Sequence, residues 1–272
     1  MTRMPLDLTL SELLLTHDAA GPRAVAQSAG VTPTLNEAAL QTAARYGPPA
    51  VAALFVVDLS PTTVAIVRAA GAPSPGFHFL LVGRLLYGLL GDPFEVADRY
   101  PPAWSARGDL PDRAWPAEPL PGRTVAQVLE AFHAGDMPWL LGGAQALLDG
   151  TRLVFESDVP EEARLRRLWK LLPDRSRADL RPATFAPSLD LDFHVTVTPT
   201  PAATPANHLS ADQTRDYPEG RYELALQVAV ESGDQAALDR LFARRTSADV
   251  LRLALTAVGV ATAAALVAKL AF

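Results

Sequence analysis

Apolar and polar residues alternate along the first third of the chain in the way that is typical of antiparallel strands. Two short runs of this kind, residues 8–15 and 23–27, are separated by turn-forming residues, so we expect a hairpin. A stretch of helical composition follows at residues 36–46 and stops at a Gly-Pro-Pro sequence. Three further β-rich runs then occupy residues 51–59, 63–68 and 77–82.

Helical spacing replaces this alternation in the middle of the chain. Residues 124–134 predict a helix capped by Thr124, and residues 160–172 predict one that begins with proline and glutamates and becomes arginine-rich near its end. Between them, residues 99–123 hold six prolines together with Trp104 and Trp115. Proline prevents regular ladders, but tryptophan is rarely left in water, so we expect an ordered loop packed on the domain.

Strict alternation returns at residues 189–198, which predict a strand. Residues 199–218 then contain four prolines and almost no large apolar side chain, which indicates a linker. The sequence therefore predicts an α+β fold, with an antiparallel or mixed sheet and packed helices in residues 1–198. A tether at 199–218, a helical hairpin at 219–246 and a hydrophobic helix at 247–272 complete this organisation.

Composition narrows the functional classes. The 272 residues carry 24 basic and 30 acidic side chains, a net charge of −6, which argues against a protein that coats nucleic acid. The absence of cysteine excludes disulfides, thiolate metal sites and cysteine nucleophiles. The N-terminal segment lacks the apolar stretch of a signal peptide, so we expect a cytoplasmic protein. No cofactor motif is present, and we expect no cofactor.

The strand predicted at residues 189–198 carries the one polar constellation that suggests chemistry. Its period of two places Asp190, Asp192 and His194 on the same face, where they could share a cation. A solvated strand face requires the same alternation and is the simpler interpretation. No residue is assigned as catalytic, because no serine lies in a nucleophile elbow and no histidine has a recognisable partner. Adjacent Gly142 and Gly143 favour close backbone packing over an anion cradle.

Two features suggest contact with another molecule. The helix predicted at residues 160–172 presents Arg164, Arg167 and Lys170, which either form a solvated face or dock on an acidic protein patch or lipid headgroups. The exposed parts of the proline-rich loop would add Trp104 and Trp115 to this interaction surface.

The C-terminal segment allows two interpretations. Sixteen residues from Leu253 pass without a charge, which is nearly long enough to span a bilayer, and four arginines precede them. Its many alanines, however, contribute little to membrane insertion. We therefore consider an inner-membrane anchor and, as the alternative, a buried or partner-binding helix. The membrane-proximal basic residues are Arg240, Arg244, Arg245 and Arg252.

Several short motifs resemble the N-terminal module of bacterial GTPase-associated proteins. They are FHFLL at residues 77–81, WLLGGAQ at 139–145, LVF at 153–155 and LWKLLP at 168–173, followed by Arg175 and Arg177. The resemblance covers about 200 residues and contains no catalytic signature. It implies a non-enzymatic adaptor of a multi-gene bacterial system, with a GTPase-system component among its protein partners. The alternative is a soluble enzyme whose site lies in the central α+β domain.

Overall fold

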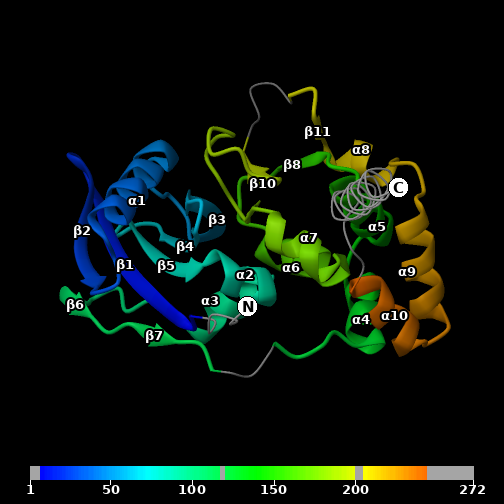
Figure 1. The fold of residues 1–272 in the computed structure, drawn as a ribbon. Coiled ribbons are helices and arrows are strands. Elements are labelled where there is room, and N and C mark those ends of the chain that lie inside the picture. The colour runs from blue at the N-terminus through cyan, green and yellow to red at the C-terminus, as the bar shows by residue number, and fades with distance from the viewer. Residues whose placement is uncertain (1–6, 117–119, 200–204, 244–272) are drawn as a thin grey trace, which may run out of the picture.

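One mixed sheet runs through the molecule (Figure 1). The computed structural model describes residues 7–116, 120–199 and 205–243. In this part of the chain the strand order is β11-β8-β10-β9-β3-β4-β5-β1-β2-β6, with β7 paired to β1. The predicted fold class, a sheet with packed helices, is confirmed.

Five antiparallel strands form the N-terminal part of the sheet, and each lies within a few residues of a predicted run. Cross-strand pairs place Phe55 and Phe77 on one face and Arg68 and His78 on the other. Both faces of the three central strands are covered, which explains why β3, β4 and β5 are mainly apolar and buried. The strands are β1 (Thr9–Asp18), β2 (Gly21–Ser28), β3 (Ala53–Ser60), β4 (Thr63–Ala70) and β5 (Gly76–Gly83).

Helix α1 (Pro33–Tyr46) covers the face that carries Phe55 and Phe77. It begins where the Thr32 hydroxyl accepts the backbone N–H of Leu35 and proline occupies the first turn, both favourable at a helix start. At its last residue, the Tyr46 ring stacks on Phe55 with centroids 4.7 Å apart. The Tyr46 hydroxyl also donates to the carbonyl of Phe185 at 3.0 Å, which ties α1 to the C-terminal half.

Two short helices, α2 (Arg84–Leu90) and α3 (Pro93–Arg99), lie at the opposite face. Asp92 connects them, because its carboxylate accepts the backbone N–H groups of the first turn of α3 at 3.1 and 3.2 Å. The same carboxylate forms a buried ion pair with Arg177. Trp169 donates its indole N–H to the carbonyl of Gly91 at 3.1 Å, so the helical half is fastened to this junction.

The C-terminal half contributes short parallel strands and most of the helices. Its strands are β8 (Arg152–Glu156), β9 (Pro182–Ala183), β10 (Val195–Thr198) and β11 (His208–Leu209). Its helices are α4 (Val125–Ala134), α5 (Met137–Leu148), α6 (Glu162–Leu171), α7 (Asp174–Asp179), α8 (Ala211–Arg215), α9 (Arg221–Glu231) and α10 (Gln235–Phe242). The proline-rich loop between the halves adds β6 (Gly108–Leu110) and β7 (Arg113–Ala114) to the N-terminal sheet edge.

Gly142 and Gly143 allow α8 to pack closely on α5. A Cβ atom on Gly142 would lie 2.1 Å from the carbonyl oxygen of Thr214, and one on Gly143 would lie 3.3 Å from the Thr214 methyl group. The prediction that these glycines serve backbone packing is confirmed.

The two halves of the sheet meet at a narrow junction between β3 and β9. One residue pair, Phe55 with Ala183, forms the register there. Thr184 strengthens it, because its side chain accepts the N–H of Leu54 at 2.8 Å and its own N–H donates to the Leu54 carbonyl at 2.8 Å.

The strand predicted at residues 189–198 is wrong in its first half. Residues 189–192 form a turn, in which the N–H of Asp192 donates to the carbonyl of Leu189 at 3.1 Å. Asp192 adopts a φ of 59°, a left-handed conformation that ends any extended run. Strand β10 begins only at Val195.

Part of the predicted tether is also folded. Residues 205–218 contain β11, which pairs with β8, and α8, which packs on α5. The predicted helical hairpin is present as α9 and α10, and α9 packs against α4 and α5. The hydrophobic segment at 247–272 lies outside the described residues. Within residues 7–116, 120–199 and 205–243, no helix combines the length and apolarity needed to cross a bilayer.

Candidate functional site

Asp190, Asp192 and His194 do not form a shared site. The Asp192 carboxylate binds Arg152 through both oxygens, and the Asp190 carboxylate accepts the Ser188 hydroxyl at 2.8 Å. His194 makes a different contact, because its Nδ1 accepts the backbone N–H of Arg181 at 3.1 Å. No group of three His, Asp or Glu side chains in the described part of the chain is placed to hold a metal ion.

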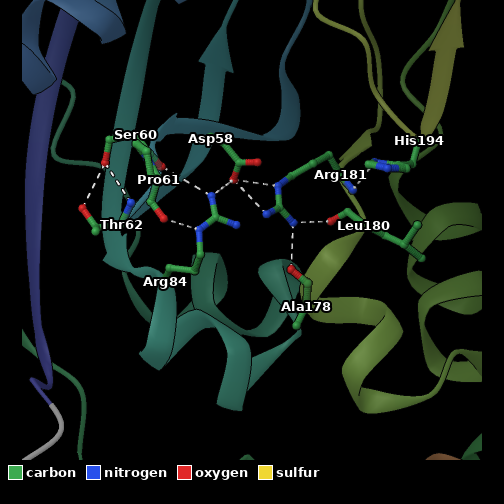
Figure 2. A network of polar contacts seen from close by, with 9 residues as sticks. All are labelled: Asp58, Ser60, Pro61, Thr62, Arg84, Ala178, Leu180, Arg181 and His194. Atoms are coloured by element: carbon green, nitrogen blue, oxygen red, sulfur yellow. Dashed lines mark hydrogen bonds and ion pairs between the residues drawn. The ribbon is translucent and has the colours of Figure 1, made fainter. Parts of the chain in front are cut away.

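His194 belongs instead to a polar network that joins the two halves of the molecule (Figure 2). Asp58, near the end of β3, accepts Arg181 Nε at 3.0 Å and Nη2 at 2.8 Å, and it also pairs with Arg84 at 2.7 Å. Arg181 Nη1 donates to two backbone carbonyls of its own turn at 2.8 and 2.9 Å. The Arg181 guanidinium thereby fixes the backbone that points at His194.

This network defines the protonation state of His194. Burial, reinforced by the charges of Arg152 and Arg181, lowers the pKa of His194 to about 4. The imidazole is therefore neutral at pH 7. Since Nδ1 accepts a hydrogen bond, the ring proton is on Nε2.

The predicted basic surface on α6 is smaller than its sequence suggests. The Arg164 guanidinium lies over the Trp139 ring, 4.1 Å from its centroid, and burial lowers its pKa. Arg166, between the candidates, pairs with Glu162 and Asp98. Arg167 and Lys170 are half-buried, and no ion pair joins either to another described residue. These two side chains are the remaining cations of the predicted surface.

The two tryptophans of the proline-rich loop have different environments. Trp115 is only 3% exposed and lies beneath Arg99, whose guanidinium is 4.9 Å from the ring centroid. It therefore belongs to the core. Trp104 is 40% exposed and remains accessible to a partner.

Trp104 borders a groove of about 570 Å³ at the ends of β3 and β4. Small side chains explain the hollow, since its lining is dominated by alanines with two prolines at one side. The apolar lining residues are Ala52, Ala53, Ala69, Ala70, Ala97, Pro101, Pro102 and Trp104.

A buried polar cluster positions Trp104. Its indole meets the edge of the His78 ring, with centroids 6.4 Å apart. His78 Nε2 lies 3.2 Å from Glu12 Oε1, and Arg113 Nε donates to Glu12 Oε2 at 3.0 Å. Burial would raise the pKa of Glu12, but hydrogen bonds and charge from His78 and Arg113 outweigh it and lower the pKa. Glu12 is thus ionised and holds both partners in place.

Charges at the rim of the groove neutralise one another. Arg68 binds Asp98 at 2.8 Å, and Asp98 also accepts Arg166 at 2.8 Å. Arg166 in turn binds Glu162, which lies at the same rim. Two cations and two anions are paired there, so the groove offers apolar surface without a net charge.

The predicted membrane-proximal residues are only partly placed. Arg240 is exposed on α10, whereas Arg244, Arg245 and Arg252 lie outside the described residues. The alanines of the Trp104 groove could not be predicted, because pairs of alanines at strand ends carry no signal for a surface. Trp104, in the proline-rich loop, is the one indication of this surface in the sequence.

The chain matches no protein-family model, and a search of curated proteins finds no match.

Proposed function

We infer that this chain is a non-enzymatic protein-interaction module whose Trp104 groove receives an apolar, uncharged segment of a partner polypeptide. The supporting observation is the combination of an exposed tryptophan with an alanine-lined hollow of about 570 Å³. Exposed aromatic anchors beside a pocket are the usual centres of binding energy at protein interfaces.

The electrostatics of the rim favour an uncharged occupant. A charged segment would lose its hydration and find only cations and anions that are already paired with one another. An apolar segment has no charge to desolvate. Its binding is favoured by about 25 cal/mol for each Å² of apolar surface that it removes from water.

The sequence resemblance suggests the first partners to examine, which are components of a bacterial GTPase system. The C-terminal segment adds a location to this proposal, since an inner-membrane anchor at residues 247–272 would hold the adaptor at the membrane. Cell fractionation with and without the residues after Arg245 tests the anchor, because a soluble full-length protein contradicts it.

Peptide-display selection on the purified chain tests the groove directly. We expect the selected peptides to be apolar and uncharged, and we expect Trp104→Ala to weaken their binding at least tenfold. Leu129→Ala is the matched control, because Leu129 is 38% exposed on α4, outside the groove. An Ala70→Arg variant, which places a long cation in the groove, should also abolish binding. Charged peptides, or equal binding by all variants, would contradict the proposal.

Affinity purification of the full-length protein in detergent then connects the groove to a natural partner. The informative result is a partner that wild type and Leu129→Ala retain but Trp104→Ala loses. A benzophenone amino acid at position 70 should crosslink to that partner. Partners that bind all variants equally would contradict the assignment of the groove.

A further inference from the structure

A second hollow, separate from the Trp104 groove, has the character of a small-molecule site. This cleft has a volume of about 520 Å³ and lies between the end of α5 with its following turn, α7 and the start of α9. Small-molecule sites usually measure about 300–1,000 Å³ and combine apolar walls with a few convergent polar groups. Here Leu147, Leu148 and Leu180 supply apolar wall, and the acidic, basic and histidine side chains that line the cleft are Asp149, Arg152, Asp179, His194 and Arg221.

Three hydrogen-bond donors in the cleft have no acceptor among the residues that the structure describes. Ser176 is only 8% exposed, and its hydroxyl forms no hydrogen bond with any residue that the structure describes. His194 carries its ring proton on Nε2, for which the described residues offer no acceptor. Arg221 is exposed at the start of α9 and has no ion-pair partner within residues 7–116, 120–199 and 205–243. The Ser176 hydroxyl is reachable from the cleft, so a molecule bound there can supply the acceptor that the described residues do not.

The acidic groups are largely engaged by the protein. Asp149 accepts Gln145 Nε2 at 3.0 Å through both oxygens and the Tyr217 hydroxyl at 3.2 Å. Arg152, which lines the cleft, forms an ion pair with Asp192. Asp179 is the one carboxylate lining the cleft for which the described chain provides no partner. Free donors therefore outnumber free acceptors, which favours a ligand rich in acceptors.

The start of α9 adds to this preference. Its N-cap is Gly220, which supplies no side chain to bind the first N–H groups. Gln145 Oε1, which lies against Gly220, accepts the N–H of Glu223 at 3.4 Å and so satisfies one of these donors. Glu223 partly opposes the partial positive charge of this helix end through a hydrogen bond with Gly220, although burial raises its pKa. The cation of Arg221 stands at the same helix end.

We propose that this cleft binds a small organic molecule through an anionic head group, phosphate or carboxylate, held by Arg221, Ser176 and His194. The neutral Nε2–H of His194 and the Ser176 hydroxyl donate to head-group oxygens, and Arg221 supplies the charge. Asp179 accepts from a hydroxyl or amino group elsewhere on the same ligand. Since these side chains come from α7, the residue before β10 and the start of α9, the ligand bridges elements that are far apart in the sequence.

Calorimetric titration of the full chain tests the site and separates the two head groups. The phosphate series is inorganic phosphate, pyrophosphate and adenosine monophosphate, and the carboxylate series is succinate and citrate. We expect saturable binding of at least one series, with Arg221→Gln and Ser176→Ala each weakening it at least tenfold. Arg23→Gln is the matched control, because Arg23 is an exposed arginine on β2 outside the cleft.

Two results would overturn the proposal. One is the absence of binding by every probe at 10 millimolar, roughly the weak limit at which a built site should still respond. The other is equal binding by Arg221→Gln, Ser176→Ala and Arg23→Gln. Circular dichroism of each variant shows whether the fold is kept, and since Arg221 and Ser176 lie on different helices, two independent variants report on the site.

Discussion

Replacing His194 with asparagine should flatten the dependence of stability on pH. His194 is held neutral by burial and by two neighbouring arginines, and its pKa falls to about 4 from an unfolded value of 6.5. Asparagine has an oxygen that can accept the backbone N–H of Arg181, as Nδ1 does. The variant thus removes the titrating group and keeps its hydrogen bond.

The sign and size of the effect follow from proton linkage. Below pH 6.5 the unfolded chain binds a proton at His194, whereas the folded protein does not bind this proton until the pH falls to about 4. Stability contributed by the neutral imidazole is therefore complete above pH 6.5 and is lost as the pH falls toward 4. At pH 5 the loss amounts to about 2 kcal/mol.

Urea unfolding at pH 7.5 and pH 5, followed by circular dichroism, measures this loss. Carboxylates titrate alike in both proteins, so the difference between wild type and His194→Asn isolates the histidine. With a slope of about 3 kcal/mol per molar urea, the wild-type midpoint should fall by about 0.7 M more than that of the variant. His133→Asn, at an exposed position on α4, should behave as wild type. Equal losses in wild type and His194→Asn would refute the reasoning.

Three further substitutions test the packing by urea unfolding. Gly142→Ala should destabilise the fold by about 1–3 kcal/mol, since its Cβ would lie 2.1 Å from a backbone carbonyl oxygen. Gly88→Ala on α2 should stabilise the fold by up to about 1 kcal/mol, because its Cβ would meet nothing within 4 Å. Similar effects of the two substitutions would contradict the close approach at Gly142. Asp92→Ala leaves the buried Arg177 with only the exposed Asp174 at 3.7 Å and should lose about 3–5 kcal/mol, part of which Arg177→Met restores in the double variant. A loss below 1 kcal/mol would count against a buried pair. Thr124→Ala removes the capping box of α4 and should lose about 1 kcal/mol, and an unchanged midpoint would show that this helix end needs no cap.

Local patterns predicted the N-terminal sheet well because each strand there owes its position to neighbouring turns. Residues 51–59 were expected as a strand, and β3 covers Ala53–Ser60. The signals for alternation, turns and caps all lie within a few residues of one another, which is the range that sequence reading covers.

The candidate site was less predictable, because its determinants are distant in the sequence. Alternation at residues 189–198 resembled a strand, but Arg152 binds the Asp192 carboxylate from 40 positions away and Asp192 adopts a left-handed turn. Residues 205–218 looked like a tether for lack of apolar residues. They fold nonetheless, aided by the capping box of Ser210 and Gln213 that starts α8, a signal readable in the sequence.

The narrow junction between β3 and β9 has a consequence during protein synthesis. The five N-terminal strands and α1 are complete once residue 83 has been made, and every pairing among them is available by then. The outer edge of β3, which carries Phe55, is covered only when Ala183 and Thr184 arrive, 100 residues later. A nascent chain therefore presents an open, apolar strand edge for that interval, and edges of this kind recruit other chains. Arrested nascent chains that end before residue 183 should bind chaperones at this edge.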